Sequence, residues 1–163
     1  MELDKLFQMQ KALDCHIEQN HGLENEDLFT RKVLALLVEV GELANETRCF
    51  KFWSLKPSSA KEVIVEEFVD GVHFILSLGI ECGFDQKQYA LEVHESTSTV
   101  TEQFLRVYEG INIFQVGRSF DDYVRLFELY LQLAALLGLK EEEIEKAYFE
   151  KNEVNYQRQQ NNY

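Results

Sequence analysis

The sequence contains few of the residues that interrupt helices: it has one proline, Pro57, and eight glycines among 163 residues. Proline and glycine are the residues that most destabilise a helix interior. No stretch alternates apolar and polar residues over the length of a strand. The 45% of hydrophobic residues suffices for one sizeable core. We therefore predict an all-α protein in which residues 1–163 form a single domain without a tail.

Basic residues are also scarce, because 16 Lys and Arg stand against 29 Asp and Glu, a formal net charge of -13. Such a charge repels phosphate backbones and anionic membrane surfaces, which argues against nucleic acid or membrane as a partner. A small anionic substrate would have to bind through metal ions or through a few well-placed cations.

The three cysteines, Cys15, Cys49 and Cys82, form no CxxC pair. An odd number of widely spaced cysteines is typical of reduced thiols. No run of about 18 apolar residues occurs, and the acidic start of the chain does not resemble a signal peptide. We expect a cytoplasmic protein that is neither secreted nor membrane-spanning.

Helical periodicity divides the chain into about six segments. The expected breaks fall at residues 21–22, 54–59, 83, 110–117 and 138. Ser59 and Ser119 each precede an acidic residue by three positions, so each is expected to cap a helix. Gly83 and Gly138 are placed to end helices in the left-handed conformation. The expected fold is a compact bundle of about six helices.

Two segments carry acidic pairs three residues apart, Glu39 with Glu42 and Glu67 with Asp70. At about 100° per residue, Glu39, Glu42 and the nearby Glu46 fall within about 60° of one another. Both segments carry apolar residues on nearly every face, which is typical of central helices. The carboxylates are therefore expected to lie away from solvent.

Four such acids need partners, because an ionised carboxylate buried alone is costly. Too few basic residues lie on these two segments to pair all four. Mg²⁺ is commonly held by a few carboxylates together with water and substrate phosphates. Further along the third segment, His73 and Ser77 are expected to lie on a wet strip beside Glu62 and Glu66.

Two other interpretations of the acids stay open. Acidic pairs at this spacing are often no more than a solvated helix face. A di-iron carboxylate bundle would need Glu-x-x-His motifs from two helices. The sequence offers only Asp70-Gly71-Val72-His73 as an imperfect substitute, which disfavours that interpretation.

Polar residues also interrupt apolar stripes near both ends of the chain. Gln10 and Asp14 lie inside the first stripe, where they either bond a neighbouring helix or read the edge of a base. The last stripe turns from apolar to Lys151, Asn155 and Arg158. This part is either a fraying basic helix end or one wall of a phosphate site.

An aromatic and basic loop, residues 50–57, separates the two acidic segments. Its Trp53 either caps the core or stacks on a nucleobase.

The order and spacing of the acidic pairs, Glu-x-x-Glu followed by Glu-x-x-Asp, resemble the metal signature of the all-α NTP pyrophosphatases. This superfamily includes MazG-like enzymes and dimeric dUTPases. The sequence is most similar to dimeric dUTPases, through FQMQKALD at residues 7–14, FKFW with Lys-Pro at residues 50–57, and KNEVNYQRQ at residues 151–159. The resemblance covers nearly the whole chain.

This resemblance implies a Mg²⁺-dependent hydrolase that converts dUTP to dUMP and pyrophosphate within a four-helix catalytic core, and it leaves the use of dUDP open. Glu39, Glu42, Glu67 and Asp70 would hold two or more Mg²⁺ ions, for which Mn²⁺ could substitute. Glu39 or Glu42 would also activate the attacking water.

The resemblance further implies a homodimer whose protomers complete each other's active site. Substrate would be bound by Gln10, Asp14 and Trp53 at the base or sugar, and by Lys151, Asn155 and Arg158 at the triphosphate. Asp14 stands where an Asn is expected in some members of the family. The alternatives are the same chemistry on another nucleoside triphosphate, such as dCTP, and a non-catalytic helical dimer that binds a protein partner.

Overall fold

The computed structural model describes residues 1–163, and its regular elements are all helical, as predicted. Its elements are α1 (Leu3–His21), α2 (Phe29–Thr47), α3 (Lys61–Glu81), the short 3-10 helix η1 (Phe84–Gln86), α4 (Val100–Gly117), α5 (Phe120–Leu136) and α6 (Glu141–Gln160). The number of α-helices matches the expected six. None of them has the length and apolar character that a membrane span requires.

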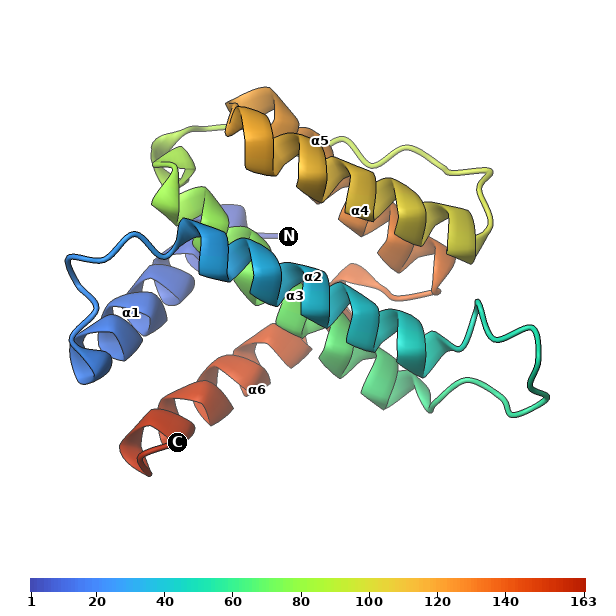
Figure 1. The fold of residues 1–163 in the computed structure, drawn as a ribbon, viewed down its shortest axis with the longest axis horizontal. Coiled ribbons are helices and arrows are strands. Elements are labelled where there is room, and N and C mark those ends of the chain that lie inside the picture. The colour runs from blue at the N-terminus through green and yellow to red at the C-terminus, as the bar shows by residue number, and fades with distance from the viewer.

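Helix α3 is the centre of the fold, since it packs against α1, α2, α5 and α6. Twelve of its 21 residues are buried. Helix α2 runs alongside α3, the α4–α5 hairpin covers one side of this pair, and α1 and α6 lie on the other (Figure 1). His73 and Ser77 of α3 therefore lie beneath α1 and α6, whereas Glu62 and Glu66 stay exposed.

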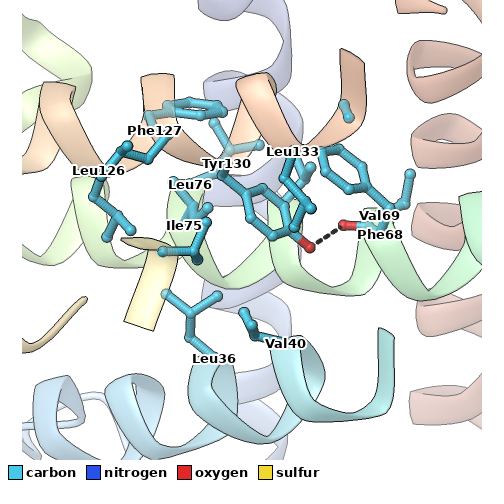
Figure 2. Close-up of a cluster of buried hydrophobic side chains, with 14 of the residues drawn as sticks. Leu36, Val40, Phe68, Val69, Ile75, Leu76, Leu126, Phe127, Tyr130 and Leu133 are labelled. Carbon is cyan, nitrogen blue, oxygen red and sulfur yellow. Dashed lines mark hydrogen bonds between the residues drawn. The ribbon is translucent and has the colours of Figure 1, made fainter. Parts of the chain in front are cut away.

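Two tyrosines of α5 hold α3 at close range. The Tyr130 hydroxyl donates to the Phe68 carbonyl oxygen at 2.8 Å (Figure 2), and the Tyr123 hydroxyl donates to that of Ile75 at 3.0 Å. Each tyrosine passes over a glycine of α3, Gly71 or Gly79, where a Cβ atom would overlap the phenol. The missing side chains thus permit the close approach of the two helices.

Helix α2 is not the fully buried element that its sequence predicts. Leu34 is 62% exposed and Val38 is 50% exposed, and Glu42 is exposed as well. Glu39 and Glu46 are half-buried. The reason is that α2 packs mainly against α3 and α4, which leaves part of its circumference uncovered.

Several helix ends follow the expected signals. The Ser119 side chain accepts a hydrogen bond from the Asp122 amide at 3.1 Å and so caps α5. Gly83 and Gly138 follow the ends of α3 and α5 with φ of 73° and 70°, in the left-handed region that favours glycine.

Two other expected boundaries are wrong. Ser59 does not cap α3, whose N-cap residue is Ala60, because its hydroxyl donates to the Glu46 carboxylate instead. This bond holds the loop of residues 48–60 against the end of α2. Gly110 does not interrupt α4, since it is buried there against Leu129 of α5.

Candidate functional site

A cleft of ≈ 420 Å³ lies between α1, α2, α3 and α6. It collects six of the ten predicted site residues: Gln10, Asp14, Glu39, Asp70, Asn155 and Arg158. A larger cleft of ≈ 820 Å³ near the N-terminus is lined mainly by apolar side chains and contains none of the ten. The smaller cleft is therefore the candidate active site.

At one end of this cleft, carboxylate oxygens of Glu39, Glu67 and Asp70 all lie within 4.8 Å of one another. Burial, together with Asp70 and Glu42, raises the pKa of Glu39 to about 7. Burial and neighbouring carboxylates also raise the pKa of Glu67. Glu42 thus acts on this acidic cluster electrostatically, although its own side chain is exposed.

Lys151 of α6 supplies a cation to the acidic cluster. Its Nζ lies 2.8 Å from Oδ2 of Asp70 and 3.0 Å from Oε1 of Glu66. Burial nevertheless raises the pKa of Asp70 more than Lys151 and Arg158 lower it. The negative charge of the cluster is therefore only partly compensated.

The donor atoms of the cluster fit a hard divalent cation. They are carboxylate oxygens from two adjacent helices, close enough to share an ion, and the pKa values of these groups are raised mainly because burial disfavours the ionised state. No histidine or cysteine belongs to the group. This oxygen-only set is suited to Mg²⁺ and does not resemble a di-iron site with histidine ligands.

At the other end of the cleft, the buried amide of Gln10 bonds its neighbours through its oxygen and through one of its two N–H groups. Its Nε2 donates to Oδ1 of Asp14 at 2.8 Å, and its Oε1 accepts from the Tyr148 hydroxyl at 2.8 Å. The same Oε1 lies 2.7 Å from Nδ1 of His73. Because an amide oxygen can only accept, Nδ1 of His73 carries the proton and Nε2 is a free acceptor.

His73 remains neutral in this setting, since burial and the charge of Lys151 lower its pKa to about 3. Its ring stacks on Tyr148 with centroids 4.2 Å apart. Nε2 is buried and has no hydrogen-bond partner within the protein. The cleft is therefore lined by a residue with an unused acceptor atom.

Asp14 links this network to two further residues that line the cleft. Its Oδ2 accepts from the Ser77 hydroxyl at 2.6 Å and lies 3.7 Å from Nζ of Lys32. Lys32 also pairs with Glu18 and Glu81. This arrangement joins α1, α2 and α3 at the inner end of the cleft.

The expected wet strip on α3 is wrong for two of its four residues, because His73 and Ser77 are only 5% and 2% exposed. Helices α1 and α6 cover them. His73, Ser77 and Lys32 were not among the predicted site residues. The available signal was the spacing of residues 70, 73 and 77, which places them on one stripe of a helix.

The structure does not bring Trp53 to the cleft. Trp53 is 65% exposed and contacts Phe52 and Phe50, with ring centroids 5.0 and 6.0 Å apart. The loop of residues 48–60 joins the end of α2 to the start of α3. The cleft lies toward the opposite ends of these helices, which explains the separation.

The comparison with known families agrees with this site. A family model described as dUTPase matches residues 2–163. The chain belongs to this dUTPase family. The enzyme is therefore a hydrolase that acts on dUTP, as the resemblance of the sequence implies. No curated protein gave a match to the chain.

Substitution of Glu39 tests whether the uncompensated negative charge of the acidic cluster destabilises the fold. The Glu39 pKa of about 7 exceeds the ordinary 4.5, so the metal-free enzyme loses stability as pH rises from about 4.5 to about 7. Glu39→Gln removes this loss and should unfold in urea with a free energy higher by about 1 kcal/mol at pH 8 in chelator, allowing for partial exposure. The two proteins should be equally stable at pH 4.5.

Glu109→Gln, at an exposed carboxylate on α4, is the control and should show no such pH-dependent gain. A Glu39→Gln protein that is no more stable than the native chain at pH 8 would contradict the raised pKa of Glu39 and the burial and neighbouring charges that cause it.

Proposed function

We propose that the enzyme hydrolyses dUTP to dUMP and pyrophosphate with two or more Mg²⁺ ions held by Glu39, Glu42, Glu67 and Asp70. The observation that carries this proposal is the group of carboxylate oxygens within 4.8 Å at the end of a cleft. Mn²⁺ would substitute because it accepts the same oxygen ligands.

The triphosphate would lie at the acidic end of the cleft. Mg²⁺ held there would neutralise phosphate charge and lower the pKa of the attacking water. Arg158 and Asn155 line the same cleft and would bind phosphate oxygens, joined by Lys151. Glu39 or Glu42 would accept the proton of the attacking water. The raised pKa of Glu39 in the metal-free protein shows an environment that favours holding a proton.

The nucleoside would follow α3 inward from the metals. At 1.5 Å per residue, His73 lies about 4.5 Å and Ser77 about 10 Å along the axis from Asp70. These separations suit a substrate with its phosphates at Asp70 and its base near His73, beside Gln10 and Asp14. The cleft also has apolar walls there, including Leu13 and Phe74.

The roles of Gln10 and His73 at the base follow from their hydrogen bonds. Since the Gln10 oxygen is already bonded to Tyr148 and close to His73 Nδ1, Gln10 would fix the tautomer of His73 and offer its remaining N–H to the base. Nε2 of His73 would then accept the N3–H of uracil. Cytosine has an acceptor at that position, so it would leave two acceptors facing each other.

The same proposal includes a homodimer of single-domain protomers located in the cytoplasm. Apolar side chains are exposed on α2, at Leu34 and Val38, and in the loop that carries Trp53. These surfaces are available to a second copy, and the loop could place Trp53 beside substrate bound by the partner. The three cysteines are free thiols, which fits a reducing compartment.

The metal dependence is tested by pyrophosphate release from dUTP, dUDP, dCTP, dTTP, UTP and ATP, with Mg²⁺ and with chelator. We expect turnover of dUTP in Mg²⁺ alone, and losses of at least about 100-fold in kcat for Glu67→Gln and Asp70→Asn. Glu62→Gln, an exposed change on the same helix, is the control. Full activity in chelator would refute the metal proposal, and faster turnover of dCTP would change the assigned substrate.

The base contact is tested by His73→Phe, which keeps a flat ring but has no acceptor. The ratio of kcat/KM for dUTP over dCTP should fall roughly 100-fold. The ratio for dUTP over dTTP should not change, because thymine also has an N3–H. His94→Phe, at a side chain that is 76% exposed, is the matched control. An unchanged dUTP over dCTP ratio would exclude this role of His73.

Light scattering of the purified enzyme measures the oligomeric state directly. We expect a mass of about twice the 19.1 kDa chain. Leu34→Glu with Val38→Glu should shift the mass toward one chain if α2 lies in the interface. A native protein with the mass of one chain at all concentrations would rule out the homodimer.

A further inference from the structure

Lys151 occupies an unusual position for a residue expected to bind substrate phosphates. Its ammonium is bonded to Asp70 and Glu66, and its side chain is only 11% exposed. Burial acts to lower the pKa of Lys151, but the two carboxylates outweigh it and raise the pKa. The lysine therefore stays charged as the counter-ion of a carboxylate in the acidic cluster.

This position opposes occupation of the cluster by metal. Asp70 shares its carboxylate with Lys151 through Oδ2, and one of its oxygens also lies within 4.8 Å of a carboxylate oxygen of Glu39 and of one of Glu67. A Mg²⁺ ion binds carboxylate oxygens at about 2.0–2.1 Å and requires near-octahedral geometry. An ammonium on the same carboxylate would lie within a few ångströms of the ion and repel it.

Glu66 offers the lysine a second contact outside the cluster. Its side chain is 60% exposed, whereas that of Asp70 is 19% exposed. The two carboxylates lie one turn apart on α3, and Lys151 bridges them from α6. A shift of Nζ away from Asp70 would therefore leave the lysine anchored at the rim of the site.

We propose that Lys151 is a resident counter-ion of Asp70 that Mg²⁺ displaces, and that its released ammonium then becomes available to the phosphates of the substrate. This inference rests on the proposed function, because it takes Asp70 as a metal ligand. It predicts that metal and nucleotide bind with positive coupling. Metal binding frees a phosphate-binding cation, and nucleotide binding removes a competitor of the metal.

The test is calorimetric titration of Mg²⁺ into the native enzyme and into Lys151→Met, each with and without the non-hydrolysable analogue α,β-imido-dUTP. Without nucleotide, Lys151→Met should bind Mg²⁺ about tenfold more tightly than the native enzyme. With Mg²⁺ present, the variant should bind the analogue more weakly. The increase in Mg²⁺ affinity that the analogue causes should be smaller in the variant than in the native enzyme.

Lys61→Met is the matched control, since it removes the same charge from the same pair of helices. Lys61 pairs with Glu143 at 2.7 Å in an exposed ion pair outside the cleft. Its effect on Mg²⁺ affinity measures the general electrostatic contribution of one lysine. Equal Mg²⁺ affinities for Lys151→Met and Lys61→Met, or weaker binding by Lys151→Met, would overturn the displacement.

A nuclear magnetic resonance experiment follows the ammonium itself in the native enzyme. The ¹⁵N-ammonium signal of Lys151, identified by its absence in Lys151→Met, should be protected from exchange without metal and lose this protection when Mg²⁺ is added. If calorimetry shows Mg²⁺ binding but the ammonium signal of Lys151 does not change, the displacement is refuted and the metal proposal stands. Absence of Mg²⁺ binding to the native enzyme would instead refute the metal proposal on which the inference rests.

Discussion

Helix α3 must satisfy two opposed requirements along its length. One side is held against the core by the tyrosines of α5, which bond to its backbone where the glycines allow close approach. Another side carries Glu67, Asp70 and His73 toward α2, α1 and α6. Because the helix is fixed by its core side, the carboxylates cannot move apart to relieve their repulsion. The repulsion can be relieved only by protons or by cations from outside the helix.

The same constraint prepares the inner end of the cleft. Gln10 and Asp14 of α1 bond His73 and Ser77 of α3, and Tyr148 of α6 donates to Gln10 and stacks on His73. Polar groups held this way keep their orientation before a ligand arrives, so little ordering remains to be done on binding. Charge at one end of the cleft and fixed hydrogen-bonding groups at the other suit the two halves of a nucleotide.

The fold and the acidic cluster could be predicted because both depend on local spacing. Low proline and glycine content and the helical period indicate the six helices, and two acidic pairs at i, i+3 place carboxylates on common faces. Which face of a helix is covered by another helix depends on the packing of the whole chain. The local pattern therefore predicts solvent exposure for His73 and Ser77, which α1 and α6 bury. It predicts shielding from solvent for Glu42, which is exposed on α2. The position of the loop that carries Trp53 likewise depends on where α2 ends.

The isolation of Trp53 has an experimental use. It is the only tryptophan of the chain, and it lies on an exposed loop beside Phe50 and Phe52, outside the cleft. Intrinsic fluorescence excited at the indole band therefore originates from this loop alone. The native chain therefore contains a single optical reporter, whose emission maximum reports how much water surrounds the indole of Trp53.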